Sequence, residues 1–205
     1  MGGEQEKTEM KPIFIIITIT AIFTLAIYLK LNQAKIRGKL GETRVSLILK
    51  SLSDNYHSFN DVYIKRGNTS VQIDHIVISI YGIFVIETKN YTGWIYGSDK
   101  SEKWTKNMYG NKYYFQNPLI QNYYHIKALQ DIFELSIDKF IPVVVFLRGA
   151  TLKCKTHGVV IYSSQLKDLI NSYTTQIMNT EDVERLTKLL ISLPPADKEL
   201  KKTTH

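Results

Sequence analysis

The pattern of apolar and polar positions separates one long apolar run from a body of shorter elements. The run extends from Pro12 to Leu29 and contains no charged residue. A helix needs about 20 mostly apolar residues to cross a lipid bilayer. The pattern therefore predicts an N-terminal tail over residues 1–11 and a transmembrane helix over residues 12–31.

The body of the chain alternates between helical and extended patterns. Apolar residues recur at helical spacing in residues 40–52, 119–135 and 181–193. Short runs of mainly apolar, largely β-branched residues predict strands at residues 57–65, 72–78, 82–89, 141–147 and 159–162. This order predicts an α/β fold, in which a mixed sheet with an antiparallel hairpin is flanked by helices.

Local signals refine the ends of these elements. Asn117 and Pro118 form a typical helix start, with Asn as the N-cap and Pro at the first helical position. Gly38 and Gly41 predict a break between the apolar run and the first helix of the body, because glycine disfavours a helix interior. Residues 90–116 are rich in Gly, Asn, Tyr and Trp and predict an excursion of short strands or loops.

Three charged residues interrupt two of the apolar strands. Asp74 lies in the first strand, and Glu87 and Lys89 lie in the second, after a short turn at residues 79–82. Unpaired charges are costly in buried strands. Side chains two apart share a face, and a tight turn would place Asp74 opposite Glu87 or Lys89. We therefore expect two carboxylates and one ammonium to converge on one point, as in a divalent-metal site.

Simpler interpretations exist for these residues and their neighbours. Asp74 and Lys89 could form a structural cross-strand ion pair. His75 follows Asp74 and should point to the opposite face, where a structural histidine is expected. Cys154 and His157 supply only two ligands and do not make a zinc site.

Aromatic residues are frequent in and after the excursion. Trp94 and Trp104 are expected to pack within it rather than to stack on bases. The tyrosines could contact nucleic acid, although packing also explains them, at Tyr109, Tyr113, Tyr114, Tyr123 and Tyr124.

The distribution of charge bears on location. The net charge is +7, and much of the excess directly follows the apolar run, at Lys30, Lys35, Arg37, Lys39 and Arg44. The positive-inside rule then places the body in the cytoplasm and the N-terminus outside. The single cysteine, Cys154, fits a reducing compartment. A basic surface of this kind suits an anionic membrane or a phosphate backbone.

A cleaved signal peptide and a buried core helix are the alternatives for the apolar run. Acidic residues outnumber lysines before the run, whereas a signal peptide begins with a basic segment. The run is also long for either alternative. An uncleaved, single-pass anchor in the cell membrane is therefore the preferred interpretation.

The charged strands resemble a known family. Gln72-Ile73-Asp74-His75, the stretch from Gly82 to Asn90, and Asn117-Pro118-Leu119-Ile120-Gln121-Asn122 look like the NERD (nuclease-related) domain. Further agreement, in the same order, comes from Gly41-Glu42, Gly93, Gly97 and Trp104. The resemblance covers residues 38–154. Residues 155–193 would complete the domain with a strand and helices, and residues 194–205 are expected to form a disordered tail.

The resemblance has implications for fold and chemistry. NERD domains are placed among the PD-(D/E)xK nucleases, which implies a restriction-endonuclease-like fold with an αβββαβ core. It implies that Asp74 is the strand aspartate and that Glu87 and Lys89 are the Glu-x-Lys pair, with Asp74 and Glu87 as ligands of Mg²⁺ or Mn²⁺. Glu42 matches the acidic residue of the first helix, and Gln121 matches a glutamine on the following helix.

Two function hypotheses follow from this set of residues. The first is a membrane-anchored, cytoplasmic, Mg²⁺-dependent nuclease that hydrolyses DNA or RNA. The second is a nuclease-fold module with weak or no turnover, which binds nucleic acid or a protein partner at the membrane. Glu42 and Gln121 also have structural interpretations, because an acid near a helix start is favoured by the helix dipole and polar residues are ordinary there.

Overall fold

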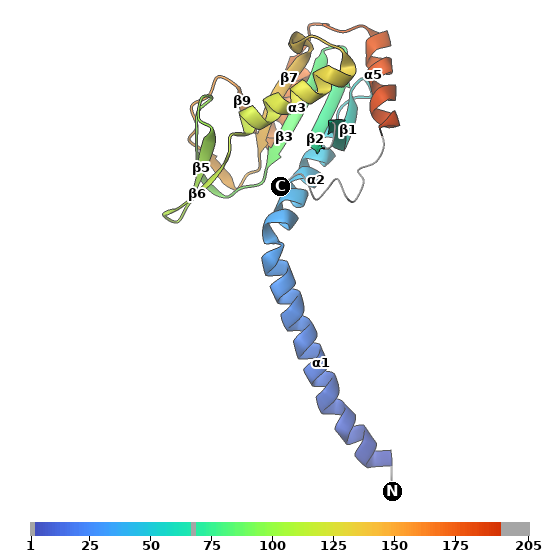
Figure 1. The fold of residues 1–205 in the computed structure, drawn as a ribbon, viewed down its shortest axis with the longest axis vertical. Coiled ribbons are helices and arrows are strands. Elements are labelled where there is room, and N and C mark those ends of the chain that lie inside the picture. The colour runs from blue at the N-terminus through green and yellow to red at the C-terminus, as the bar shows by residue number, and fades with distance from the viewer. Residues whose placement is uncertain (1–2, 67–68, 194–205) are drawn as a thin grey trace. The chain divides into compact units, whose positions relative to one another are not determined.

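The computed structural model describes residues 3–66 and 69–193 of the 205-residue chain. The expected disordered tail, residues 194–205, lies outside this part. The chain divides into two compact units, Met1–Lys39 and Leu40–His205, and each is described by itself. Figure 1 shows the elements of both units.

The first unit is dominated by one long helix, α1 (Gly3–Leu31). Its segment Ile13–Leu31 is long and apolar enough to cross a membrane, and none of that segment is buried. The hydroxyl groups of the threonines bond to backbone carbonyls one turn earlier, as Thr18 Oγ1 does to Phe14 at 2.8 Å. These bonds satisfy the polar groups internally, as a helix in lipid requires.

The predicted break near Gly38 and Gly41 is wrong. α2 (Gln33–Leu49) runs through both glycines without interruption. Gly41 is explained by packing, because a Cβ atom at this position would lie 2.7 Å from Cβ of Asn90 and 3.4 Å from a methyl group of Leu147. The glycine therefore allows α2 to lie close against the end of the sheet rather than ending the helix.

The second unit contains a five-stranded mixed sheet in the order β1-β2-β3-β7-β9. Its strands are β1 (His57–Arg66), β2 (Thr69–Ser79), β3 (Gly82–Lys89), β7 (Phe140–Phe146) and β9 (Val159–Tyr162). The hairpin β2–β3 is antiparallel, and β3, β7 and β9 run parallel. The central strands β3 and β7 are buried on both faces, which explains their continuous apolar sequences.

Helices cover both faces of this sheet. α3 (Pro118–Phe133) and α5 (Thr180–Ser192) enclose a cluster of apolar side chains on one face, and α3 is seen crossing that face in Figure 1. The other face is covered by α4 (Leu166–Ser172) and by the C-terminal half of α2. A 3₁₀ turn, Ser163–Gln165, precedes α4, and another, Ile137–Lys139, precedes β7. The predicted α/β class, a mixed sheet flanked by helices, is confirmed.

The excursion at residues 90–116 forms most of a second sheet. Its four strands, in the order β6-β5-β4-β8, are β4 (Gly93–Tyr96), β5 (Lys103–Met108), β6 (Asn111–Gln116) and β8 (Ala150–Leu152). Trp104 is fully buried and stacks on Phe146 of the larger sheet, with ring centroids 6.3 Å apart. Trp94 is 52% exposed, so the expectation that both tryptophans pack the excursion holds for Trp104 alone.

Candidate functional site

The turn between β2 and β3 sets the register of the charged residues. Ser79 pairs with Gly82, so the tight turn centres on Ile80 and Tyr81. The printed pairing ends at His75 opposite Ile86, and the same register carried one position further directs Asp74 toward Glu87. The two carboxyl groups lie close enough for the charge of Glu87 to act on Asp74. Of the two registers that the sequence allowed, the structure therefore has the one that brings the two carboxylates together.

The strand backbone is distorted where Asp74 lies. Ile73 and Ile76 are three positions apart, yet both belong to the apolar cluster beneath α3 and α5. On the neighbouring strand, the β1–β2 pairing skips Asp61, which lies between the pairs Asn60–His75 and Val62–Ile73 and has a φ of 58°, in the left-handed region. Such interruptions of strand alternation re-aim a side chain, and here they free Asp74 from the apolar core.

All the residues that the sequence singled out meet at this end of the sheet. Asp74 Oδ2 accepts a hydrogen bond from the Thr88 amide at 2.8 Å. Lys89 Nζ donates to Glu87 Oε1 at 2.6 Å and to Gln121 Oε1 of α3 at 3.0 Å. Glu42 of α2 lies close enough to Asp74 for its charge to act on that carboxyl. Two strands and two helices thus each contribute to one cluster.

The cluster raises the pKa of Asp74 well above its usual range. Burial is the main cause, and the charges of Glu87 and Glu42 add to it. The amide bond from Thr88 and the charge of Lys89 act in the opposite direction but do not compensate. Ionised Asp74 is therefore held at a cost, which a cation placed between the two carboxylates would relieve.

Lys89 remains a cation at neutral pH. Burial alone would lower the pKa of Lys89, but the charges of Glu87 and Tyr91 and the hydrogen bond to Glu87 raise it above its ordinary value. A protonated lysine can hold an anion or orient a water molecule, and it does not act as a general base.

Sequence reasoning missed His125, which lies beside Glu87. Its Nδ1 is 3.5 Å from Glu87 Oε2, and the two side chains are 6% and 2% exposed. Neither atom has a hydrogen-bond partner in the part of the chain that the structure describes. Burial lowers the pKa of His125, so the ring is neutral at neutral pH. The signal was present in the sequence, because His125 follows Gln121 by four residues and shares its helix face.

Asn122 fixes the height of α3 above the sheet. The residue is fully buried, and its Nδ2 donates to the backbone carbonyls of Val85 in β3 and Val143 in β7, at 2.8 and 3.2 Å. These bonds join the helix to the two central strands next to Glu87. They therefore position Gln121, the preceding residue of α3.

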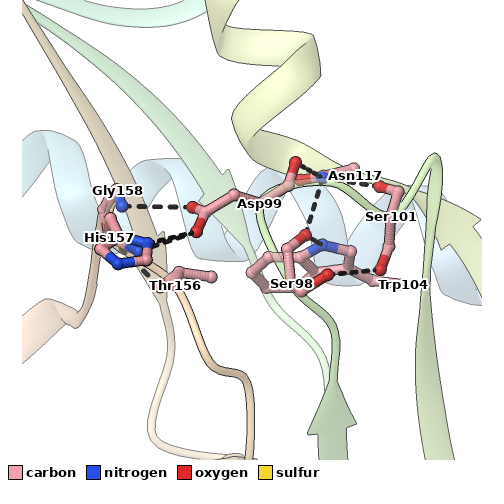
Figure 2. A network of polar contacts seen from close by, with 8 residues as sticks. All are labelled: Ser98, Asp99, Ser101, Trp104, Asn117, Thr156, His157 and Gly158. Carbon is pink, nitrogen blue, oxygen red and sulfur yellow. Dashed lines mark hydrogen bonds and ion pairs between the residues drawn. The ribbon is translucent and has the colours of Figure 1, made fainter.

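The start of α3 is held by a second polar network, shown in Figure 2. Asn117 Oδ1 caps the helix by accepting from the Leu119 amide at 2.9 Å, as the sequence predicted. Its Nδ2 donates to the backbone carbonyls of Ser98, Asp99 and Ser101, the shortest bond being 2.7 Å. The excursion thus anchors the helix that carries Gln121 and His125.

The structure also describes the two histidines and the cysteine that the sequence considered separately. His75 is buried on the opposite face, with Nδ1 2.6 Å from Asn60 Oδ1. His157 is exposed and pairs with Asp99, with Nδ1 3.1 Å from Oδ2, as Figure 2 shows. Cys154 is a free thiol, and burial raises its pKa.

The donor set fits a hard divalent cation that keeps most of its water. Among residues 3–66 and 69–193, no group of three or more His, Cys, Asp or Glu side chains is arranged to hold a metal ion. Mg²⁺ needs only one or two carboxylates from a protein, because water fills the remaining octahedral positions. The carboxylates of Asp74 and Glu87 meet that need, and Oε2 of Glu87 is buried without a hydrogen-bond partner among the described residues.

Comparison with known proteins identifies the family. Residues 37–147 match the family model of the nuclease-related domain, NERD. An uncharacterized protein of Bacillus anthracis is 36% identical over 198 residues, which is 93% of this chain and 92% of the relative. No solved structure matches the chain. The match spans more than half of the sequence, and the chain belongs to the nuclease-related domain family.

Proposed function

We propose that this protein is a membrane-anchored, metal-dependent nuclease whose site faces the cytoplasm. The observation that carries the proposal is the closeness of three charged groups: the charge of Glu87 acts on Asp74, and Lys89 Nζ donates to Glu87 Oε1 at 2.6 Å. Membership of the nuclease-related domain family supports the same chemistry. The reaction is hydrolysis of phosphodiester bonds in DNA or RNA.

Asp74 and Glu87 hold the metal ion in this proposal. Mg²⁺, or Mn²⁺ in its place, supplies charge stabilisation at the scissile phosphate and a water molecule of lowered pKa. Asp74 is fixed by the Thr88 amide, and the Thr88 carbonyl is a possible further ligand. Binding of the cation relieves the repulsion between the two carboxylates, which is the reason for such a costly arrangement.

In this proposal Lys89 stabilises the charge on the phosphate, and Gln121 positions Lys89. Lys89 is charged, and Gln121 Oε1 accepts one of its hydrogens at 3.0 Å, which fixes the ammonium between α3 and β3. From there Lys89 stabilises the negative charge that develops on the phosphate oxygens. Glu42 lies close enough to Asp74 for its charge to act there, and in this proposal it orients the attacking water molecule.

The anchor places this chemistry at a membrane. α1 carries a segment of sufficient length and apolarity, Ile13–Leu31, and the basic residues that follow it favour a cytoplasmic body. The single cysteine is consistent with that compartment.

A cleavage assay on the full chain tests the proposal. Protein purified in detergent micelles is mixed with end-labelled single-stranded and double-stranded DNA and RNA, in Mg²⁺ or in EDTA. We expect cleavage of at least one substrate in Mg²⁺ and none in EDTA. Glu87→Gln and Lys89→Gln should each lower the rate by about 10³-fold or more, as for a lost charge-stabilising group. Cleavage that continues in EDTA, or variant rates equal to the wild-type rate, would contradict the proposal.

A binding module without turnover is the second candidate, and one contact favours it. Lys89 and Glu87 bond to each other at 2.6 Å, so the acid and the lysine satisfy one another without a substrate. Under this alternative, nucleic acid or a protein partner binds equally well with and without metal. Binding that is unchanged by EDTA and by Asp74→Asn, together with no cleavage of any substrate, would select it.

A further inference from the structure

Lys106 of β5 lies between two aromatic rings. Its Nζ is 5.3 Å from the ring centroid of Tyr91 and 4.9 Å from that of Tyr113. Lys106 pairs directly with Tyr113 across the β5–β6 hairpin, so the strands themselves set this contact. Cation–π attraction fixes the position of an ammonium group and leaves its charge in place.

Tyr91 connects this lysine to the candidate active site. It follows Lys89 by two residues, and Phe146, which its ring contacts, is paired with Lys89 across β3 and β7. Its ring is held edge-on by Phe115 at 4.8 Å and by Phe146 at 6.5 Å. Lys106 is therefore separated from Lys89 by one firmly packed tyrosine.

The fold brings the hairpin back over this tyrosine through a close backbone contact. Gly93 has a φ of 91°, and a Cβ atom there would lie 2.3 Å from the Asn107 carbonyl oxygen. Only glycine permits this approach of β5 to the start of β4. The position of Lys106 is thus built into the connection between the two sheets.

The charge of Lys106 has no carboxylate partner in the part of the chain that the structure describes. Asp99 of the same excursion is engaged by His157. Tyr113 on its far side is 48% exposed and presents an aromatic surface to solvent. A fixed cation beside an open aromatic ring matches a nucleotide, which offers a phosphate and a base.

We propose that Lys106, held between Tyr91 and Tyr113, binds the phosphate next to the one that is cleaved, and that Tyr113 stacks on the adjoining unpaired base. The substrate strand then runs from the two carboxylates along the inner face of the β5–β6 hairpin. Stacking needs an unpaired base, so the subsite selects single-stranded nucleic acid over a duplex. This inference rests on the proposed nuclease function, since it extends the same site.

Binding measured without cleavage tests the subsite. The full chain in detergent micelles is titrated, in Ca²⁺ to suppress hydrolysis, with fluorescein-labelled single-stranded DNA and RNA of about 12 nucleotides and with the matching duplexes. Lys106→Gln should weaken single-strand binding about tenfold, the effect of one charged hydrogen bond, and reduce the salt slope by about 0.7. Tyr113→Leu should weaken binding of the single strands and leave the duplexes unchanged.

Two further variants serve as controls for folding and for general charge. Lys106→Arg keeps the cation and should restore most of the affinity. Lys127→Gln removes another half-buried lysine that lies over a tyrosine, 5.5 Å from the Tyr123 ring on α3, and should change binding less than about twofold. Equal losses in Lys106→Gln and Lys127→Gln would overturn the subsite, because the effect would then be one of net charge.

Replacing single phosphates of the oligonucleotide by an uncharged analogue identifies the phosphate that Lys106 contacts. Single methylphosphonates are placed along the oligonucleotide, and at one position the penalty of Lys106→Gln should disappear. If the penalty persists at every position, the subsite is overturned even where the protein cleaves its substrates in Mg²⁺. If the penalty disappears at one position while no substrate is cleaved, the subsite stands and the proposed hydrolysis fails.

Discussion

At the scale of single residues, two buried carboxylates in the site repel each other. Asp74 and Glu87 lie on neighbouring strands, close enough for their charges to interact, and burial makes their joint ionisation costly. A stable fold has no need of this arrangement, and one aspartate-to-asparagine change would remove it. Such conflicts between local structure and stability are expected where a protein binds a cation.

Asp74→Asn should therefore stabilise the metal-free protein. The pKa of Asp74 is raised in the folded state above its ordinary value of 3.8, so the stabilising effect of the bound proton is complete below that pH. The effect is lost as the pH rises through the raised pKa. Asparagine keeps an oxygen for the Thr88 amide and never ionises. At neutral pH in EDTA, the melting temperature of the Asp74→Asn protein should exceed that of the wild type. The difference should be about 2–4 °C for each kcal/mol of relieved repulsion.

The pH dependence supplies the control for this prediction. The difference in melting temperature between the two proteins should grow from acid to neutral pH, and Mg²⁺ should reduce it by stabilising the wild type alone. A difference that stays constant with pH would mean that the Asp74 carboxyl is not the group responsible.

His125 should act on metal binding through Glu87. His125→Leu keeps the volume and removes the Nδ1 that lies 3.5 Å from Glu87 Oε2. Loss of a group that orients a ligand lowers metal affinity about 10- to 100-fold, and we expect a loss of this size for Mg²⁺ in calorimetry. His125→Gln, which restores a donor, should recover part of the affinity.

His75 provides the matched buried histidine. It lies on the opposite face and contacts Asn60, so His75→Leu should lower the melting temperature while Mg²⁺ affinity changes less than about twofold. Equal losses of Mg²⁺ affinity in both leucine variants would show that His125 acts only through stability.

At the scale of elements, the position of α3 depends on its first residue. Asn117 caps the helix and also binds three backbone carbonyls of the excursion. Asn117→Ala should lower the free energy of unfolding by about 2–4 kcal/mol, since it removes a cap and three part-buried bonds to the carbonyls of the excursion. Chemical denaturation measures this change, and the cleavage rate should fall with it because α3 carries Gln121.

Asn179 is a control that separates the helix-capping role of Asn117 from its bonds to the excursion. It caps α5 by accepting from the Asp182 amide at 2.7 Å, in an exposed position. Asn179→Ala should cost only about 1 kcal/mol and leave cleavage unchanged. An equal cost in the two alanine variants would refute the view that Asn117 joins the excursion to the helix.

The sequence predicted the helices and central strands because each has a strong local signal. The apolar runs of β3 and β7, and the Asn-Pro start of α3, needed no long-range information. The sheet built from residues 90–116 could not be foreseen, because it depends on β8, which is distant in sequence and pairs with β4. Gly41 was misread for the same reason, since its partners Asn90 and Leu147 are remote.

The candidate site divides in the same way. Asp74, Glu87 and Lys89 follow from strand parity, which is local, although the register remained open until the turn was known. His125, Asn122 and Lys106 required the packing of α3 and of the second sheet against β3. Their sequence spacing alone does not distinguish them from ordinary polar residues.

At the scale of the whole molecule, the account predicts a single-pass anchor with a cytoplasmic body. A fluorescent protein that matures only in the cytoplasm, fused after His205, should be bright, and protease added to intact cells should leave the body and the fluorescent protein uncut. Replacing Lys30, Lys35, Arg37 and Lys39 by glutamine should lower the fraction in this orientation, because the positive-inside signal is weakened. Cutting of the body or of the fluorescent protein by external protease would contradict the proposed orientation.

The rate of phosphodiester cleavage by wild-type and Asp74→Asn protein, prepared in parallel and assayed in Mg²⁺, tests the central claim most directly. Both proteins should be folded, and the variant should have the higher melting temperature in EDTA. We predict cleavage by the wild type and a rate at least about 10³-fold lower for Asp74→Asn. Equal rates in the two proteins would contradict the assignment of Asp74 and Glu87 as the metal site.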